Sequence, residues 1–338
     1  MRAALPDEIK TARLRLRPPM AADRELVVEG LNDLAVSGWL ARVVHPYSTA
    51  DFDAYFPQAR AGFNYVIEDE AGFAGCISLN PHIGYWLSPP AQGRGYATEA
   101  ARAILAAHFA ADADAVISGY FEGNDRSAHV LTKLGFVETG RGLQMCLAFG
   151  AERAHVDLVL TRSDFIAAQP MLARSARLGY RDLQPFDATD LHAIVSNWDV
   201  ARQLGSFPWP SDPAFTATRA QPYTGDGFAW GVHLNGALIG TVAVTKGELG
   251  YMIAPAQWRQ GFAMEACRCA LTHAFETLPL DEITAGVWAD NAGSRGVLAK
   301  LGFKVIAETN QMSKARGVMA DGFDLALTRA AWAERRGA

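Results

Sequence analysis

One long pattern occurs twice in this chain, and that duplication constrains its fold more than any other feature. In each copy a glycine-containing stretch leads into an alanine-rich run, and Asn-x-x-Ser, Lys-Leu-Gly-Phe and Asp-Leu-x-Leu-Thr-Arg motifs follow in the same order. The paired segments are 84–100 and 250–266, 124–136 and 291–303, and 157–162 and 324–329. Each copy is far longer than the ~20–50 residues of a solenoid repeat. The pattern therefore predicts two similar domains, and 338 residues suit two domains of about 100–200 residues each.

The junction between the domains is expected within Ser163–Arg174. This stretch follows the last strand-like run of the first copy and contains Gln169 and Pro170. A polar segment interrupted by proline is a common domain linker. We therefore assign residues 1–165 to the first domain and 174–338 to the second.

Composition and charge exclude several classes of protein. The net charge is −5 and no basic block is present, which argues against a nucleic-acid partner and leans towards a cationic or amine substrate. The first eight residues include Asp7 and Glu8 where a signal peptide would be apolar. No apolar run approaches the ~20 residues that a membrane span needs. A cytoplasmic protein without membrane contact is expected.

The four cysteines do not form a recognisable framework. Cys267 and Cys269 lie two apart on a predicted helix, so they point to different faces and cannot form a metal pair. Cys76 and Cys146 lie in strand-like runs. Buried, reduced thiols are expected, with no disulfide, no metal site and no cysteine nucleophile.

The sequence of each copy predicts strands and helices in alternation. Residues 63–79 and 230–244 predict β-hairpins, the second with the strong turn signal Asn235-Gly236. The expected elements that follow are strands 84–87 and 250–253, helices carrying apolar stripes over 97–109 and 263–275, strands 115–121 and 282–288, and a short helix over 125–134 that Gly135 ends. The fold class is therefore α+β, with two domains that each have a mixed, mainly antiparallel sheet flanked by helices.

The glycine-containing loop in each copy suits an anion. Amides at a helix start are unpaired and carry the positive end of the helix dipole, provided that side chains leave the approach open. Small residues keep it open at Gly93, Gly95 and Ala97 in the first copy and at Gly261 and Ala263 in the second. Arg94 and Arg259 can add charge-assisted contacts to a phosphate.

One such loop alone is equally well explained as a turn that feeds a core helix. It lacks the Lys-Ser/Thr of a nucleoside-triphosphate loop and the third glycine of a dinucleotide fingerprint. Two copies, each followed by the same downstream motifs, favour a phosphate-bearing cofactor over that structural explanation.

The combined motifs resemble a known family. Gln92–Ala100, then Asn124-x-x-Ser127 and Leu134-Gly135-Phe136, together with Thr11-x-Arg13-Leu14-x-Leu16-Arg17, look like the GNAT acyltransferase superfamily, in particular its Rim-type (ribosomal-protein-alanine N-acetyltransferase-like) branch. The resemblance covers both copies. It implies an N-acetyltransferase that uses acetyl-CoA, and a primary amine on a protein N-terminus or a small molecule that attacks the thioester directly, with no covalent enzyme intermediate.

The resemblance also implies which residues bind the cofactor. Amides of residues 93–98 and 259–264 would hold the diphosphate, the strand residues before them would line the pantetheine arm, and the Asn of Asn-x-x-Ser would hold its far end. The positions are Trp86, Leu87, Gln92, Gly93, Arg94, Gly95, Ala97, Thr98 and Asn124 in the first copy, and Met252, Ile253, Arg259, Gln260, Gly261, Ala263, Met264 and Asn291 in the second.

Catalytic residues are carried over in the same way. Many relatives place a tyrosine acid where this chain has Leu131 and Leu298, so Ser127 and Ser294 are the candidates for protonating the leaving thiolate. The alternative is that these serines only cap a helix.

The general base is expected two residues before Gly-Tyr. That position is His82 in the first copy and Glu248 in the second, although a residue at a strand end is often simply solvated. His45 and His129 are weaker candidates.

Other readings remain open. In the first alternative, one or both copies bind CoA without catalysis, as a sensor or a structural half; in the second, the transfer goes to an aminoglycoside or involves a longer acyl chain. Segments Leu31–Pro57 and Asn197–Gln221 are expected to line the acceptor side, and the two domains to form an intramolecular pseudo-dimer.

Overall fold

The computed structural model describes residues 5–61, 64–111 and 113–337. The chain divides into two compact units, Met1–Gln169 and Pro170–Ala338. Each unit is described by itself. Within the described residues, no helix is both long and apolar enough to cross a membrane.

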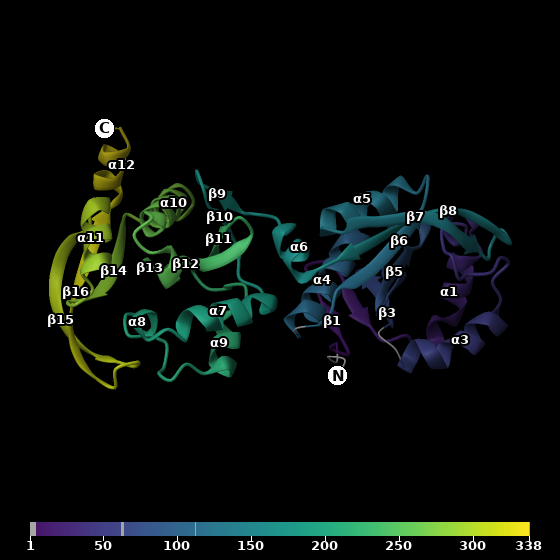
Figure 1. The fold of residues 1–338 in the computed structure, drawn as a ribbon, viewed down its shortest axis with the longest axis horizontal. Coiled ribbons are helices and arrows are strands. Elements are labelled where there is room, and N and C mark those ends of the chain that lie inside the picture. Colours follow the sequence, from purple (N-terminus) through teal and green to yellow (C-terminus); the bar gives the residue numbers. More distant parts are fainter. Residues whose placement is uncertain (1–4, 62–63, 112, 338) are drawn as a thin grey trace. The chain divides into compact units, whose positions relative to one another are not determined.

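The two units contain the same elements in the same order (Figure 1). The first unit consists of β1 (Ile9–Lys10), β2 (Arg15–Arg17), η1 (Ala21–Asp23), α1 (Arg24–Leu31), α2 (Leu34–Ser37), α3 (Thr49–Ala61), β3 (Asn64–Asp69), β4 (Gly72–Asn80), β5 (His82–Leu87), η2 (Pro89–Ala91), α4 (Tyr96–Ala110), β6 (Val116–Phe121), α5 (Asp125–Leu134), β7 (Val137–Cys146), β8 (Ala151–Leu160) and α6 (Arg162–Ala167). The second consists of β9 (Ala173–Arg174), β10 (Gly179–Asp182), η3 (Pro185–Asp187), α7 (Ala188–Val195), α8 (Trp198–Ala201), α9 (Pro213–Arg219), β11 (Gly227–Leu234), β12 (Ala237–Thr245), β13 (Glu248–Ile253), η4 (Pro255–Gln257), α10 (Phe262–Thr277), β14 (Glu282–Trp288), α11 (Ala292–Leu301), β15 (Lys304–Ser313), β16 (Val318–Thr328) and α12 (Arg329–Gly337).

Each unit is built on one twisted sheet. The strand order is β1-β2-β3-β4-β5-β6-β8-β7 in the first unit and β9-β10-β11-β12-β13-β14-β16-β15 in the second. Neighbouring strands are antiparallel except for β5–β6 and β13–β14, which are parallel. This mixed, mainly antiparallel sheet with helices around it confirms the predicted α+β class.

The local signals in the sequence explain the element boundaries. Asn235 and Gly236 both have positive φ, as a two-residue hairpin turn between β11 and β12 requires. Gly135, at φ 94°, ends α5, and the Phe136 amide bonds back to the Leu131 carbonyl. The predicted hairpins and helix ends are therefore confirmed, apart from residue 63, which lies outside the described residues.

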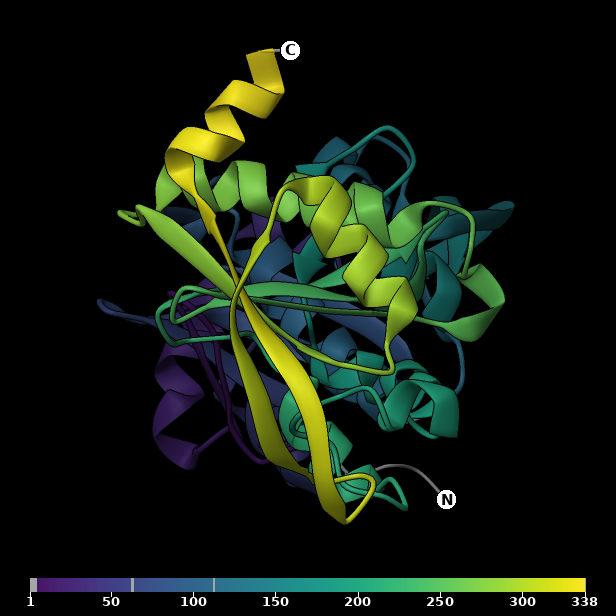
Figure 2. The same ribbon diagram turned by 90° about the vertical axis from the view of Figure 1, so that its left-hand side faces the viewer.

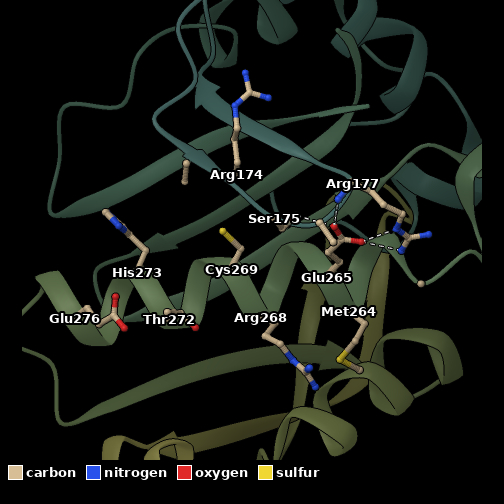
Figure 3. A pocket seen from close by; sticks show the side chains of 13 residues that line it. Arg174, Ser175, Arg177, Met264, Glu265, Arg268, Cys269, Thr272, His273 and Glu276 are labelled. Carbon is tan, nitrogen blue, oxygen red and sulfur yellow. Dashed lines mark hydrogen bonds and ion pairs between the residues drawn. The ribbon is translucent and has the colours of Figure 1, made fainter. Parts of the chain in front are cut away.

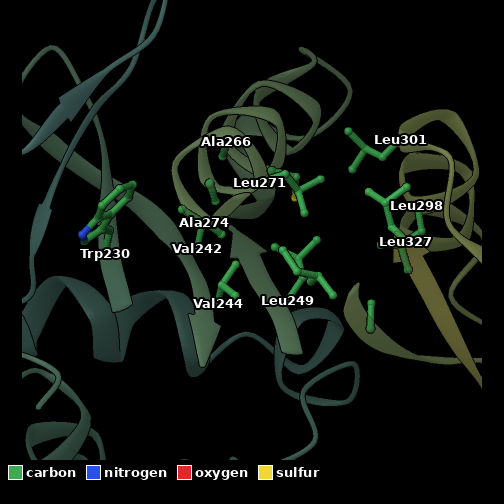
Figure 4. Packing of buried hydrophobic residues seen from close by; sticks show 14 of the residues in the cluster. Trp230, Val242, Val244, Leu249, Ala266, Leu271, Ala274, Leu298, Leu301 and Leu327 are labelled. Atoms are coloured by element: carbon green, nitrogen blue, oxygen red, sulfur yellow. The ribbon is translucent and has the colours of Figure 1, made fainter. Parts of the chain in front are cut away.

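Apolar stripes on the helices bury the sheet. In the second unit, α10 and α11 cover one face through the residues labelled in Figure 4: Ala266, Leu271, Ala274, Leu298 and Leu301 against Trp230, Val242, Val244, Leu249 and Leu327. The other face carries a smaller cluster, in which Leu191, Ile194 and Val200 pack against Leu238 and Met252. Burial of each stripe removes apolar surface from water, which stabilises the fold by about 25 cal/mol per Å² of surface buried.

The hairpin that closes each sheet is long. Figure 2 shows β15 and β16 in yellow, with α12 continuing from β16 towards the C-terminus. In both hairpins the register shifts by one residue near the start, between Val305 and Ala307 in the second unit. Such a bulge bends a strand and increases its twist.

The expected linker is structured over its first half. Residues Arg162–Ala167 form α6, which the Thr161 side chain caps by accepting from the Asp164 amide, and Phe165 is fully buried. The chain passes from one unit to the other at Gln169 and Pro170. The Thr161 cap and the Phe165–Ile166 pair provide a helix signal that outweighs the polar composition of the stretch.

Candidate active site

The parallel strands at the centre of each sheet separate after a single pair. His82 is the residue of β5 in register with β6, opposite Ile117, and Glu248 of β13 is in register with β14, opposite Thr284. In the described residues no later pair of these strands is in register. Ser118 of β6 still donates its hydroxyl to the Ile83 carbonyl at 3.1 Å, and beyond it the main chain of residues 84–87, like that of residues 249–253, has one edge that β6 or β14 does not cover.

Side chains along the separated strands alternate between two layers. Trp86 packs with Phe73 in the layer of α1, and Met252 lies in the cluster of α7. Ile253 instead joins the α10 cluster. The side chains of Trp86 and Met252 therefore serve packing, and it is the main chain that faces the gap.

The loop that follows leads into a long helix without a side-chain cap. The helices α4 and α10 have Gly95 and Gly261 at their N-caps, at φ 81° and 83°, and neither N-cap makes a side-chain bond. In the part of the chain that the structure describes, none of the amides of residues 93–98 and 259–264 donates a hydrogen bond. An array of free amides at the positive end of a helix dipole is a ready site for an anion.

The two loops differ in their side chains but keep one backbone shape. Gly93 has φ 76°, and its counterpart Arg259 has φ 60°, in the left-handed region that non-glycine residues rarely adopt. Gln92 Nε2 donates to the Leu87 carbonyl at 3.0 Å, and Trp258 Nε1 donates to the Ile253 carbonyl at 2.6 Å. The tryptophan thus replaces the glutamine bond that fastens the loop to the strand end.

Charged side chains at the first loop have protein partners. Arg94 lies 3.6 Å from Asp69, and Arg126 donates to Gln92 Oε1 at 2.8 Å. Arg94 remains half-exposed, so its guanidinium keeps access to solvent. Among the remaining expected cofactor residues, Ala97 is buried, whereas Thr98, Gln260, Ala263 and Met264 retain surface exposure.

The Asn-x-x-Ser motif caps the next helix in both units. The Asn124 side-chain oxygen accepts from the Ser127 amide at 3.1 Å, and Asn291 accepts from the Ser294 amide at 3.0 Å. The capping role that the sequence left open is therefore filled by the asparagines, not the serines. This leaves both serine hydroxyls available for another contact.

Each serine hydroxyl contacts a tyrosine that sequence reasoning missed. Tyr85 Oη lies 3.0 Å from Ser127 Oγ, and Tyr251 Oη lies 2.7 Å from Ser294 Oγ. Burial raises the pKa of Tyr85 to about 12, and burial likewise raises the pKa of Tyr251. Both phenols are therefore protonated at neutral pH. The signal was present as Gly-Tyr in both copies, but nothing local connects it to a serine over 40 residues away.

The two candidate bases occupy the same position in different surroundings. Burial lowers the pKa of His82, and the positive charge of Arg42 adds to this effect, so the imidazole is neutral at pH 7. Glu248 is exposed. A Cβ atom on Gly286 would lie 3.7 Å from Glu248 Oε1 and 3.9 Å from Asp324 Oδ1, so both carboxylates flank that glycine.

The segments expected on the acceptor side carry aromatic and basic groups. In the first unit the Arg153 guanidinium lies 4.7 Å from the Trp39 ring centre and donates to the Gly38 carbonyl. In the second, Arg316 donates to the Arg202 carbonyl at 3.0 Å. Of the weaker histidine candidates, His45 Nδ1 lies 3.5 Å from the Ser37 hydroxyl.

The second unit also carries an aromatic pair on that side. The rings of Trp198 and Trp209 meet edge to face with centres 5.0 Å apart, and both side chains are partly exposed. Trp209 comes from the Pro-Trp-Pro run expected to line the acceptor.

The cysteines are placed as unreactive thiols. All four are free, and burial raises the pKa of Cys76, Cys267 and Cys269. Because the thiolate is the nucleophile, these thiols are poor candidates for covalent catalysis. No group of three or more His, Cys, Asp or Glu side chains within the described ranges is arranged to hold a metal ion.

Comparison with known proteins gives the family. The acetyltransferase (GNAT) domain model matches residues 13–137 and again residues 177–304. The uncharacterized N-acetyltransferase YoaA of Bacillus subtilis is 33% identical over 141 residues, which is 38% of this chain and 80% of that protein. The probable N-acetyltransferase YjcK of the same organism is 37% identical over 98 residues, which is 27% of this chain and about half, 54%, of that protein.

Solved structures show a more distant likeness. The structure of Mycobacterium smegmatis RimJ in complex with CoA-disulfide is 20% identical and covers 45% of this chain and 82% of that chain, with a TM-score of 0.39. The family match, by contrast, accounts for most of both units. The chain therefore belongs to the GNAT acetyltransferase family and is an acetyltransferase, in tandem form, with acetyl-CoA as its acetyl donor.

Proposed function

We propose that each unit, comprising residues 1–165 or 174–338, is an N-acetyltransferase module that transfers the acetyl group of acetyl-CoA to a primary amine. The observation that carries this proposal is the free amide array at residues 93–98 and 259–264, which lies directly after a strand with an uncovered edge. The diphosphate of acetyl-CoA can accept hydrogen bonds from the free amides. Its pantetheine arm is an extended chain with amide groups, which can form hydrogen bonds with the uncovered strand edge.

The cofactor residues follow from this placement. The loop residues bind through their amides, the strand residues through their main chain, and Asn124 and Asn291 through the side-chain nitrogen that capping leaves free. The proposed set is Trp86, Leu87, Gln92, Gly93, Arg94, Gly95, Ala97, Thr98, Asn124, Met252, Ile253, Arg259, Gln260, Gly261, Ala263, Met264 and Asn291. Gln92 and Trp258 contribute by holding the loop against the strand end.

Proton transfer is assigned to residues at the two ends of the gap. When bound, acetyl-CoA supplies an acetyl group activated as a thioester. His82 and Glu248 accept the proton that the attacking amine loses. Tyr85 belongs to the pair to which we assign protonation of the leaving thiolate, and it follows His82 by three residues on an extended strand. Their Cα atoms are therefore about 10 Å apart, and we infer that the amine's proton reaches His82 through water.

Protonation of the leaving thiolate is assigned to the tyrosine–serine pairs. Ser127 and Ser294 each share a hydrogen bond with a buried phenol, and each pair presents a proton to the side of the gap where α5 or α11 begins. The serine hydroxyl gives this proton to the thiolate, the tyrosine reprotonates the serine, and the phenolate regains a proton from water. No cysteine takes part, which agrees with direct attack by the amine.

The acceptor is proposed at the level of a primary amine, on a protein N-terminus or a small molecule. A neutral imidazole in the first unit and the exposed carboxylate of Glu248 in the second are both able to accept the proton of an ammonium group. Because the two acceptor sides differ in charge, the units are expected to differ in the amines that they accept.

The proposal is tested by measuring CoA release from acetyl-CoA with a panel of amines and N-terminal peptides. Each unit is disabled separately with Gly95→Asp or Gly261→Asp, because aspartate tolerates the left-handed backbone better than most residues and its carboxylate repels the diphosphate. We expect each single variant to lose one of two acetyl-CoA binding sites and to retain the turnover of the other unit.

Two results would contradict the proposal. Failure of the wild-type chain to bind acetyl-CoA would exclude the assigned site. Binding of acetyl-CoA without turnover on any amine would instead support a non-catalytic CoA-binding module.

A further inference from the structure

An arginine in the turn between the first two strands of each sheet is bonded to the loop that we assign to the diphosphate. In the first unit Glu99, in the first turn of α4, accepts from Thr11 Oγ1 at 2.6 Å and from the Arg13 amide at 3.0 Å. The Arg13 Nε and Nη2 atoms donate to the other carboxylate oxygen of Glu99, at 2.8 and 2.6 Å. The remaining Arg13 nitrogen, Nη1, donates to the Arg94 carbonyl at 3.0 Å.

The same arrangement occurs in the second unit, where Figure 3 shows it by dashed lines. Glu265 accepts from Ser175 Oγ at 2.7 Å and from the Arg177 amide at 2.8 Å. Arg177 Nε and Nη2 bind the other carboxylate oxygen, at 2.8 and 2.7 Å, and Nη1 donates to the Gln260 carbonyl at 3.1 Å. We call Thr11, Arg13 and Glu99, and likewise Ser175, Arg177 and Glu265, the clasp.

Both units contain the clasp, although the side chains of the loop next to it differ between the units. Arg94 in one unit corresponds to Gln260 in the other, and the ring beneath the guanidinium is Tyr96 in one and Phe262 in the other. The contact common to both units is made to a main-chain carbonyl, so it does not depend on the side chain at that position. This indicates a role in setting the backbone of the loop.

The direction of one amide follows from that contact. A trans peptide is planar, so its C=O and N–H point in opposite directions. By holding the carbonyl of residue 94, Arg13 turns the N–H of Gly95 to the opposite side, away from the arginine. Gly95 has φ 81° and carries no Cβ atom, so its own side chain does not restrict the rotation of that peptide. Arg177 has the same relation to Gly261.

The clasp also resolves an electrostatic conflict. A carboxylate in the first turn stabilises a helix through its dipole, but it repels an anion bound at the same amides. Burial alone would raise the pKa of Glu99, yet the hydrogen bonds from Thr11 and Arg13 outweigh it and lower that pKa, so the group is charged at neutral pH. The Arg13 guanidinium neutralises this charge next to the free amides.

We propose that Arg13 and Arg177 are positioning residues for the diphosphate: each directs the amide of the N-cap glycine and neutralises the carboxylate of the first helical turn. The proposal rests on the proposed function, because it assumes that the diphosphate of acetyl-CoA binds these amides. In the second unit Arg177, Gly261 and Glu265 also line a groove of about 670 Å³ between α10 and residues 173–177, so the clasp there is open to solvent (Figure 3).

The test compares two ligands in the full-length chain. Arg13→Gln is placed in the Gly261→Asp background, so that only the first unit binds, and affinities for acetyl-CoA and for acetyl-pantetheine, which lacks the diphosphate, are measured by calorimetry. We expect acetyl-CoA to bind about tenfold more weakly or worse and acetyl-pantetheine to be unaffected. The matched control is Arg15→Gln, which removes an exposed arginine of β2 that pairs with Glu8 and not with the loop.

A second variant separates neutralisation from mere support of the fold. Adding Glu99→Gln to Arg13→Gln removes the unpaired carboxylate, so we expect acetyl-CoA affinity to recover in part, most clearly at low salt. Arg177→Gln and Glu265→Gln, in the Gly95→Asp background, should behave in the same way.

The outcomes are distinguishable from failure of the proposed function. If the parent variants do not bind acetyl-CoA, the proposed function fails. If they bind it and Arg13→Gln binds it equally well, or loses acetyl-pantetheine by the same factor, or gains nothing from Glu99→Gln, then the arginine is a structural residue and the inference is wrong.

Discussion

The loops before α4 and α10 have the same backbone shape in the two units, whereas different side chains surround the opposite end of the gap. At the loop, Gly95 and Gly261 have nearly the same φ. At the other end β5 begins with His82 and β13 with Glu248. In the first unit the His155 ring occupies the space over Gly119, whereas the carboxylates of Glu248 and Asp324 flank the equivalent Gly286. The shared end agrees with the proposal of one common donor, and the divergent end agrees with the proposal that the two units accept different amines.

A second difference lies in the core of the two units. Arg17 is buried and donates to both Asp23 and Glu68. Its counterpart Arg181 is paired with Asp187, but the position of Glu68 is taken by His233, which is 1% exposed. Within the described residues, Arg181 Nε and both ring nitrogens of His233 have no hydrogen-bond partner. The second unit therefore carries unpaired buried groups where the first carries a complete network.

The largest effect is expected at the candidate bases. His82→Gln in the Gly261→Asp background and Glu248→Gln in the Gly95→Asp background should each lower kcat/KM about 1,000-fold, because each removes the proton acceptor. The lowered pKa of His82 keeps it neutral under mildly acidic conditions, so the acid limb of the first unit's pH profile should lie below pH 6.5. Steady-state rates across pH, with Glu282→Gln as an exposed-carboxylate control, check both expectations.

An acid limb that persists unchanged in His82→Gln would show that another group is titrating. A loss in Glu282→Gln comparable with that in Glu248→Gln would remove the special role of Glu248.

Mild acid should destabilise the second unit through the buried His233, whose position in the first unit holds Glu68. Burial lowers the pKa of His233 to about 4 from 6.5, so the folded second unit resists its protonation. The free energy of unfolding of the second unit is therefore highest, with respect to His233, above pH 6.5. It falls by about 3 kcal/mol as the pH drops from 6.5 to 4. Hydrogen exchange of the β11 and β12 amides measures this loss within the second unit.

His233→Glu recreates the residue of the first unit and should abolish that loss between pH 6.5 and 4 by giving Arg181 Nε a partner. His192→Gln, at a partly exposed histidine of α7 in the same unit, should retain it. A loss that persists in His233→Glu would refute the assignment to His233.

A smaller effect is expected at the tyrosine–serine pairs. Tyr85→Phe and Tyr251→Phe should each lower the kcat of their own unit about tenfold, with unchanged acetyl-CoA affinity, because the phenol replaces the proton that the serine gives up. Single-turnover rates and calorimetry separate these two quantities. A fall in affinity that equals the fall in kcat would mean that the pair supports binding and not proton transfer.

The smallest effect concerns the left-handed residue at which the loops differ. Arg259→Gly should stabilise the second unit by about 1 kcal/mol, because glycine adopts this backbone without steric cost. Gly93→Arg should destabilise the first unit by a similar amount. Thermal unfolding of the four combinations measures both; an unchanged melting temperature in each would show that the loop relaxes around the arginine.

The sequence by itself determined everything that is local or repeated. Duplication, the Asn235-Gly236 turn, the glycine ends of α5 and α11 and the alanine stripes of α4 and α10 all follow from dihedral preferences and from hydrophobic periodicity, which neighbouring residues express without help from the rest of the chain. The free amides at Gly95 and Gly261 belong to this group, because a glycine N-cap without a capping side chain is readable from the residue order.

Only the tertiary structure decided which distant residues meet. The Arg13–Glu99 clasp, the contact of Tyr85 with Ser127, and the burial of Arg181 Nε and the His233 ring without hydrogen-bond partners all involve segments that are dozens of residues apart. Strand register and sheet order bring them together, and these depend on packing over the whole unit. The sequence therefore predicted the uncapped glycine N-termini of α4 and α10, which we propose as cofactor loops, while the residues that hold these loops and the side chains at the other end of the gap became visible only once the strands were paired.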